Sequence, residues 1–319
     1  MTPDPELRTL AVVLAQPGSL SLQTLALNPP GEEDVVVDID FSGISTGTER
    51  LLWSGRMPMF PGMGYPLVPG YESVGRVVQA GPRASRAVGE RVFVPGARCF
   101  GPVHGLFGGA ASRLVVPGHR VVPVGEASAE EGVLLALAAT AHHAVSAPGA
   151  VLPELIVGHG ALGRLMARLC VAAGSDSVVV WERDPERAKG AQGYRVMDPA
   201  EDPRRDYRAI YDVSGDASLL DTLVSRLAPG GEIVLAGFYT ERLQLDFVPA
   251  FMREARLRVA AQWSEPDMQA VRQMTLDGRL RLDGLVTHRR PAAEAPEAYR
   301  VAFEDPACLK MVIDWRTCT

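Results

Sequence analysis

The sequence predicts an α/β protein in which a β-rich N-terminal domain precedes a doubly wound parallel sheet. Three observations support this prediction. The chain has 319 residues, more than the usual length of one domain. Short β-branched runs, punctuated by Gly and Pro, fill its first third. From residue 128 onward, strand-like and helix-like segments alternate, as in βαβ units. We therefore expect one domain over 1–127, completed by the tail at about 281–319, and a second domain over 128–280.

The composition is that of a folded, soluble chain. Hydrophobic residues make up 47% and charged residues 22%, which suits a large core and excludes a disordered chain. The net charge of −6 argues against a nucleic-acid partner, which normally meets a basic face. The four cysteines are too few and too scattered for a disulfide framework. No apolar run reaches the roughly 18 residues of a membrane span, and the start has no secretory-signal pattern. We expect a cytoplasmic protein with reduced thiols.

Six runs in the first domain predict the strands of a small barrel or sandwich. They are residues 9–16, 33–43, 71–81, 90–96, 112–118 and 119–125. Residues 53–70 interrupt this pattern with an irregular segment that is unusually apolar for a loop.

The second domain begins with a helix, predicted over about 129–146 by the capping box Ser128-x-x-Glu131. Strand and helix patterns then alternate. The predicted strands are 152–158, 177–183, 208–215, 232–238 and 257–264, and the predicted helices are 161–174, 216–231 and 265–280. In the tail, 309–315 is a strand-like run that we expect to return to the first domain.

A glycine motif marks the first strand-to-helix turn of the second domain. Gly158, Gly160 and Gly163 form G-x-G-x-x-G directly after an apolar strand and directly before an amphipathic helix. The first glycine permits a tight turn, the second lets the backbone approach a pyrophosphate, and the third lets helix and strand pack closely. The pyrophosphate would lie at the helix N-terminus, where free N–H groups favour negative charge. The same turn contains further expected cofactor contacts, namely His159, Ala161 and Leu162.

An acidic residue follows the next strand at the distance expected for ribose recognition. Glu182 lies 182 − 163 = 19 positions after the third glycine, close to the usual spacing of roughly 20. Its carboxylate can accept both ribose hydroxyls of NAD and would repel the extra phosphate of NADP, although Arg183 leaves NADP use open. The alternative is a solvated charge at a strand end. We predict NAD as the cofactor. Ser214 and Gly237, which follow two other strands, are either further contacts or ordinary turn residues.

Four strings give nearly the whole chain a resemblance to the medium-chain dehydrogenase/reductase family. They are SGISTGTE at 42–49, VPGYESVGRV at 68–77, VGERVFV at 88–94 and GHGALGRL at 158–165. The resemblance implies a GroES-like β-barrel catalytic domain and a Rossmann domain, with NAD(P)-dependent hydride transfer. Relatives are often dimers joined edge to edge through the Rossmann sheet, so we expect a homodimer with 257–263 as the edge strand.

The chain departs from the zinc-dependent members of that family. They carry a Cys where this chain has Ser45, a His where it has Tyr71, and a further ligand near 136–140. Ser and Tyr are poor zinc ligands. The structural zinc of many members needs four clustered cysteines, and only Cys99 lies in that region here. The resemblance therefore implies that no metal is bound at either site.

Within the family, GISTGTERLLWSG, LVPGYESVGRVV and GHGALGRL are similar to a branch that acts in bacteriochlorophyll biosynthesis. Members of that branch use NAD to oxidise the 1-hydroxyethyl group at C3 of a bacteriochlorophyllide, a bacteriochlorin, to acetyl. The resemblance implies the same reaction here. Two alternatives stay open: a zinc-free quinone- or enoyl-reductase-like NAD(P)H oxidoreductase, and a non-catalytic protein that binds a dinucleotide or a pigment.

Without zinc, side chains must take the alcohol proton and stabilise the developing alkoxide. Tyr71 is a candidate proton relay, and Glu72 could orient it or be a buried, paired structural acid. Ser45 and Thr46 could pass the proton onward or simply form a turn. His142 is a base of suitable pKa if it faces the substrate, and otherwise a packed or surface histidine.

The apolar segment suits a flat macrocycle, because Met adapts to irregular apolar shapes and aromatic rings stack on π-systems. We expect Trp53, Met57 and Phe60 to contact the pigment, and Arg50 to bind its propionate. The same segment is equally compatible with a loop folded onto the barrel core.

Overall fold

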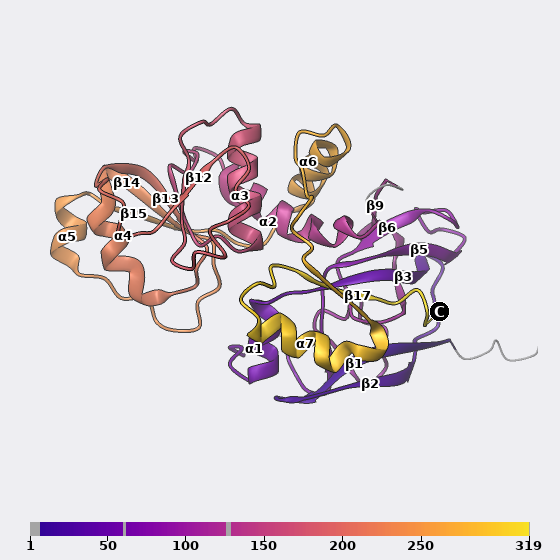
Figure 1. Ribbon diagram of the computed structural model, residues 1–319. Helices are drawn as coiled ribbons and strands as arrows, with labels where there is room; N and C mark the ends of the chain where they lie inside the picture. Colours follow the sequence, from indigo (N-terminus) through magenta and orange to yellow (C-terminus); the bar gives the residue numbers. More distant parts are fainter. Residues whose placement is uncertain (1–6, 60–61, 126–128, 319) are drawn as a thin grey trace, which may run out of the picture. The chain divides into compact units, whose positions relative to one another are not determined.

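The computed structural model describes residues 7–59, 62–125 and 129–318. Their contacts divide the chain into two compact units, which we call the β-rich unit (1–136 with 285–319) and the parallel-sheet unit (137–284) (Figure 1). The predicted α/β fold class is confirmed. Ser128, the predicted capping residue, lies outside the described residues. Within the described ranges, no helix is long and apolar enough to cross a membrane.

Two sheets form the β-rich unit. One has the strand order β2-β1-β4-β7, and the other has the order β16-β17-β3-β5-β6-β9, with β8 paired to β3. Their strands are β1 (Arg8–Gln16), β2 (Ser19–Ala26), β3 (Asp34–Ile44), β4 (Leu67–Val68), β5 (Ser73–Ala80), β6 (Arg91–Val94), β7 (His104–Gly105), β8 (Arg113–Pro117), β9 (Val122–Pro123), β16 (His288–Pro291) and β17 (Met311–Asp314). The first five predicted runs are therefore confirmed as strands, with ends that differ by a few residues.

Two details of this unit differ from the prediction. The sequence analysis missed β2, whose side chains are all at least partly exposed, although serine and leucine alternate at its start. The run 119–125 is only briefly extended, since Gly118–Arg120 form a 3-10 helix, η1, ahead of the two-residue β9.

The C-terminal tail returns to the β-rich unit, as its strand-like run predicted. β17 pairs antiparallel with β3, with Met311 opposite Ile44. The remaining helical elements of the unit are α1 (Thr48–Ser54), η3 (Glu131–Leu134), η5 (Ala292–Glu294) and α7 (Ala295–Glu304). Figure 1 shows the yellow tail beside the indigo N-terminal strands. Because of this return, residues separated by more than 200 positions in the sequence meet in one core.

The parallel-sheet unit has the strand order β12-β11-β10-β13-β14-β15. Neighbouring strands are parallel throughout, which is the 3-2-1-4-5-6 order of dinucleotide-binding sheets. The strands are β10 (Leu155–Val157), β11 (Val179–Trp181), β12 (Arg195–Met197), β13 (Tyr207–Asp212), β14 (Leu227–Leu235) and β15 (Arg256–Val259). The helices are α2 (Leu135–Val145), which begins at the end of the β-rich unit, α3 (Ala161–Ala172), η4 (Ala217–Leu219), α4 (Leu220–Arg226), α5 (Phe247–Met252) and α6 (Glu265–Leu276). The helix predicted over 216–231 ends at Arg226, because Leu227 is already extended and opens β14.

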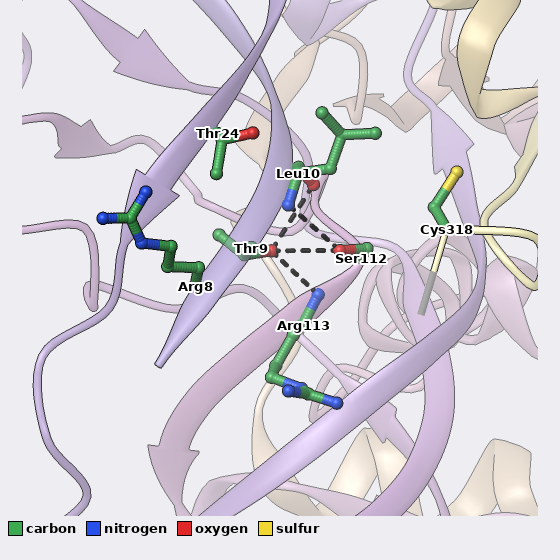
Figure 2. A pocket seen from close by; sticks show the side chains of 7 residues that line it. All are labelled: Arg8, Thr9, Leu10, Thr24, Ser112, Arg113 and Cys318. Carbon is green, nitrogen blue, oxygen red and sulfur yellow. Dashed lines mark hydrogen bonds between the residues drawn. The ribbon is translucent and has the colours of Figure 1, made fainter. Parts of the chain in front are cut away.

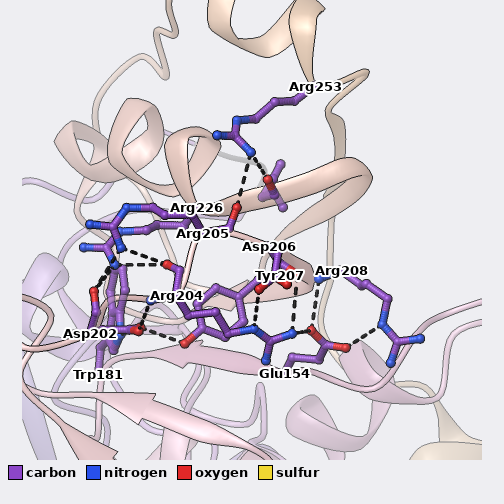
Figure 3. Close-up of polar contacts among 11 residues, drawn as sticks. Glu154, Trp181, Asp202, Arg204, Arg205, Asp206, Tyr207, Arg208, Arg226 and Arg253 are labelled. Atoms are coloured by element: carbon purple, nitrogen blue, oxygen red, sulfur yellow. Dashed lines mark hydrogen bonds and ion pairs between the residues drawn. The ribbon is translucent and has the colours of Figure 1, made fainter.

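A polar cluster fixes the connection between β12 and β13 (Figure 3). The buried carboxylate of Asp202 accepts hydrogen bonds from Trp181 Nε1 and from the Tyr207 hydroxyl, both at 2.7 Å. Arg226 donates to the Asp202 carbonyl and lies over the Trp181 ring, 4.9 Å from its centroid. Since these groups satisfy one another, the cluster is structural and offers no ligand site.

Candidate active site

The glycine motif forms a tight turn between β10 and α3. Gly158 has a φ of 106°, a conformation that other residues rarely adopt. A Cβ at Gly163 would overlap the carbonyl oxygen of Gly158, so only glycine lets α3 approach the strand this closely. Ala161 and Leu162 begin α3, whose first N–H groups have no partner within the helix. This cradle fits the pyrophosphate of a dinucleotide.

Glu182 follows β11 directly and faces the glycine turn. Its Oε1 accepts the backbone N–H groups of Arg183 at 2.9 Å and Asp184 at 3.1 Å. Its Oε2 lies 3.4 Å from the backbone nitrogen of His159 and 3.7 Å from Arg187 Nε. The carboxylate is therefore held beside the turn rather than pointing freely into solvent.

The ends of β13 and β14 lie next to the same turn. The backbone N–H of Val213 bonds to the Val157 carbonyl, and that of Gly237 bonds to the Asp212 carbonyl, both at close to 3 Å. The exposed Ser214 donates its hydroxyl to Asp212 Oδ1 at 2.6 Å. The predicted cofactor residues thus come together at the carboxyl ends of β10, β11, β13 and β14.

The ring of His159 is turned away from this face, contrary to a contact with cofactor or solvent. The residue is 0% exposed, with Nδ1 2.6 Å from the Arg187 carbonyl and Nε2 2.8 Å from the Tyr194 hydroxyl. Both ring nitrogens are occupied by the protein, so only the backbone of His159 faces the turn.

In the β-rich unit, Tyr71 and Ser45 form one hydrogen-bonded pair. The Tyr71 hydroxyl donates to Ser45 Oγ at 2.7 Å and lies 3.4 Å from Thr48 Oγ1. Burial, followed by the charge of Glu72, raises the pKa of Tyr71 well above its usual range. Tyr71 therefore stays protonated at neutral pH and can act as a donor. Thr46 is half-buried beside Ser45 in the same turn.

Glu72 is paired with a lysine from the returning tail. Lys310 Nζ lies 2.5 Å from Glu72 Oε2 and donates to the Ile44 carbonyl at 3.2 Å. The other oxygen, Oε1, is buried and has no hydrogen-bond partner within the described part of the chain. A Cβ at Gly43 would collide with this carboxylate, so glycine is required there. Burial raises the pKa of Glu72, and the ammonium of Lys310 opposes that rise.

A second buried carboxyl, Glu49, holds the backbone of Ser45. Its Oε1 accepts the Ser45 N–H at 2.9 Å, and its Oε2 accepts the Tyr299 hydroxyl at 2.6 Å. Burial raises the pKa of Glu49 to about 7, against the opposing effect of these hydrogen bonds. Sequence reasoning missed Tyr299 and Lys310, although a lysine within the apolar run 309–315 was an available signal.

His142 belongs to a clamp between α2 and α6. The Nδ1 atoms of His142 and His143 lie 2.9 and 2.8 Å from the two carboxylate oxygens of Asp267, and His142 Nε2 lies 3.1 Å from Ser146 Oγ. Both nitrogens of His142 are therefore occupied within the parallel-sheet unit, which leaves it no free base for an alcohol proton.

The residues predicted to hold a macrocycle divide into two groups. Met57 is 5% exposed and packs in an apolar cluster with Leu52 and Leu67, which favours the alternative of a loop folded onto the core. Trp53 is half-buried against Phe303, and Arg50 is exposed on α1. Phe60 lies outside the described residues.

Two other features of the described ranges add nothing to these sites. Among the residues placed there, no three His, Cys, Asp or Glu side chains are grouped as metal ligands. A cavity of about 270 Å³ opens at β1 and β8 (Figure 2). Its lining contains none of the predicted site residues, and the guanidinium of Arg113 within it is paired with Asp38.

Comparisons with known proteins agree with this fold. The family model described as the alcohol dehydrogenase GroES-like domain matches residues 31–126. The 2-desacetyl-2-hydroxyethyl bacteriochlorophyllide A dehydrogenase of Cereibacter sphaeroides is 60% identical, over 97% of this chain and 99% of its own length. The protein of the same name from Rhodobacter capsulatus is 58% identical with the same coverage. The structure of an alcohol dehydrogenase from Escherichia coli CFT073, complexed with NADH, superposes with a TM-score of 0.82 at 21% identity, over 96% of this chain and 99% of that one.

Proposed function

Because the chain belongs to the medium-chain dehydrogenase/reductase family, and within it to the 2-desacetyl-2-hydroxyethyl bacteriochlorophyllide A dehydrogenases, we propose that it oxidises the C3 1-hydroxyethyl group of a bacteriochlorophyllide to acetyl. The observation that carries the proposal is 60% identity over 97% of the chain. The product places the enzyme in bacteriochlorophyll a biosynthesis.

NAD is the proposed hydride acceptor. When bound, its nicotinamide ring takes up the hydride from the carbinol carbon. The fit of the glycine cradle supports a dinucleotide, and the carboxylate of Glu182 supports NAD over NADP because it would repel a 2′-phosphate. Gly158, Gly160 and Gly163 would admit the pyrophosphate, with Ser214 and Gly237 beside it. The guanidinium of Arg187, whose Nε lies 3.7 Å from Glu182 Oε2, partly offsets that repulsion.

The proposed reaction uses no zinc. The donor set supports this, because a serine hydroxyl and a phenol of raised pKa do not suit zinc, which prefers thiolate, imidazole or carboxylate. Instead, Tyr71 hydrogen-bonds the substrate oxygen, and the alcohol proton passes through Ser45 and the partly exposed Thr46 to solvent water. Glu72, paired with Lys310, positions Tyr71 and does not take the proton itself.

Arg50 and Trp53 on α1 remain the proposed contacts for the pigment, because they are the candidates with exposed or half-buried side chains. We also propose a homodimer that uses β15 and α5. This is supported by the position of β15 at the sheet edge and by the exposed apolar side chains beside it, which are Phe247, Val248, Phe251, Met252 and Val259.

The test is an absorbance assay on chelator-treated protein mixed with NAD and a 3-(1-hydroxyethyl)-bacteriochlorophyllide. A red shift of the far-red pigment band, matched by NADH formation, is expected to persist without zinc. NADH formation that returns only with added zinc would overturn the zinc-free mechanism. No change in either signal, with NAD still bound, would favour a reductase of another substrate or a pigment carrier.

A further inference from the structure

The loop at 183–190, which follows Glu182, is fastened to the glycine turn by buried groups that the reaction does not use. Its Arg187 carbonyl accepts two donors at once, His159 Nδ1 at 2.6 Å and Arg164 Nη2 at 2.7 Å. Arg164, on α3, also donates to the carbonyls of His159 and Lys189, at 3.0 and 2.8 Å. Arg164 is only 4% exposed, and its guanidinium connects the glycine turn to the loop at 183–190 without reaching solvent.

The protonation of His159 follows from these partners. A carbonyl can only accept, so Nδ1 carries the hydrogen, and Nε2 accepts the hydroxyl of Tyr194. Burial, followed by the charge of Arg164, lowers the pKa of His159 to about 4. The ring is thus neutral, in one tautomer, and acts as a fixed connector between the loop and Tyr194.

The fastened loop places two charged groups against the cofactor cradle. Arg187 Nη2 lies 3.3 Å from where a Cβ of Gly160 would be, so its guanidinium flanks the turn. Among the residues described, Arg187 Nε has no hydrogen-bond partner, with Glu182 Oε2 3.7 Å away. The positions of both groups depend on the backbone that His159 and Arg164 hold.

We propose that His159 and Arg164 are positioning residues for the adenosine half of the cofactor, acting through Arg187 and Glu182. The inference rests on the proposed use of a dinucleotide at this turn. It assigns to the second position of the glycine motif a role in affinity and in the choice between NAD and NADP, and none in hydride transfer.

The test compares His159→Phe, which keeps an aromatic ring and removes both hydrogen bonds, with His159→Asn, whose amide can replace the Nδ1 donor. Tyr211→Phe is the matched control, because it removes a buried hydroxyl whose partners, the Val151 carbonyl and the Arg258 guanidinium, belong neither to the glycine turn nor to the loop at 183–190. Dissociation constants are measured by calorimetry for NAD, NADP, ADP-ribose and nicotinamide mononucleotide, together with kcat at saturating NAD.

His159→Phe is expected to weaken NAD and ADP-ribose about tenfold, the size of one to two lost hydrogen bonds. Nicotinamide mononucleotide affinity and kcat should stay within about twofold, the NAD-to-NADP preference should fall, and His159→Asn should recover part of the loss. Unchanged NAD affinity in His159→Phe, or an equal loss of nicotinamide mononucleotide affinity, would overturn the inference. Failure of the unaltered protein to bind any dinucleotide would instead refute the proposed function.

Discussion

Replacing Lys310 with Met is expected to destabilise the β-rich unit by about 3–5 kcal/mol, the usual cost of leaving one partner of a buried ion pair alone. The side chains of Lys310 and Glu72 are 2% and 0% exposed, and Glu72 Oε1 already lacks a partner within the described residues. Water therefore cannot solvate the carboxylate once the ammonium is removed. The carboxylate must then take up a proton or the strands must open. Removing the ammonium raises the pKa of Glu72 further. The loss of stability of Lys310→Met relative to the unaltered protein should therefore grow as the pH rises.

Amide hydrogen exchange on peptides from β3 and β17 measures the opening of this unit by itself. Lys310→Met is compared with Glu72→Gln, with the double variant, and with Lys310→Arg. The double variant, which buries no charge, should be more stable than Lys310→Met, and Lys310→Arg should stay close to the unaltered protein. A loss below about 1 kcal/mol in Lys310→Met, or a double variant no more stable than that single one, would refute the reasoning.

Three further outcomes follow from the sites. Tyr71→Phe should lower kcat about 100-fold or more while the Kd of NAD stays within twofold, and wild-type turnover would remove Tyr71 from the proton path. Because burial raises the pKa of Glu49 from its ordinary 4.5 to about 7, the folded state holds a proton that the unfolded chain releases, and stability falls as the pH rises across this window by about 3 kcal/mol. Glu49→Gln should lack that decline in urea unfolding, and parallel pH curves would contradict the assignment. Asp267→Asn should cost about 2 kcal/mol in urea unfolding by weakening the two-histidine clamp and the capping-box bonds from Ser264, whereas Asp277→Asn, at the exposed end of α6, should leave the urea midpoint unchanged; equal losses would argue against the clamp.

The parallel-sheet unit could be predicted from sequence because its elements obey local rules. β10, the glycine turn and α3 occupy one short segment, and the spacing from Gly163 to Glu182 follows from the length of one helix and one strand. Strand β2 escaped prediction because its alternation of serine and leucine covers only residues 19–22 and its leucines are only partly buried.

The polar core of the candidate site could not be predicted, because its partners are remote in sequence. Lys310 and Glu72 are 238 positions apart, and Tyr299 and Glu49 are 250 apart. A single sequence gives no sign of which buried acid meets which donor. The orientation of His159 was also hidden, since its partners Arg187 and Tyr194 lie beyond the next strand.

The return of β17 has a consequence for synthesis of the chain on the ribosome. Residues of β3, β5 and β6 emerge long before Lys310, 266 positions after the Ile44 carbonyl to which it donates. While the parallel-sheet unit is being translated, Lys310 is not yet there to pair with Glu72. The edge of β3 that will pair with β17 is also still without its partner strand. The parallel-sheet unit, whose residues run without a break from 137 to 284, can finish folding first. The residues of the proposed proton path are therefore the last to gain their supporting contacts, and a nascent chain can form the glycine turn before the β-rich unit is complete.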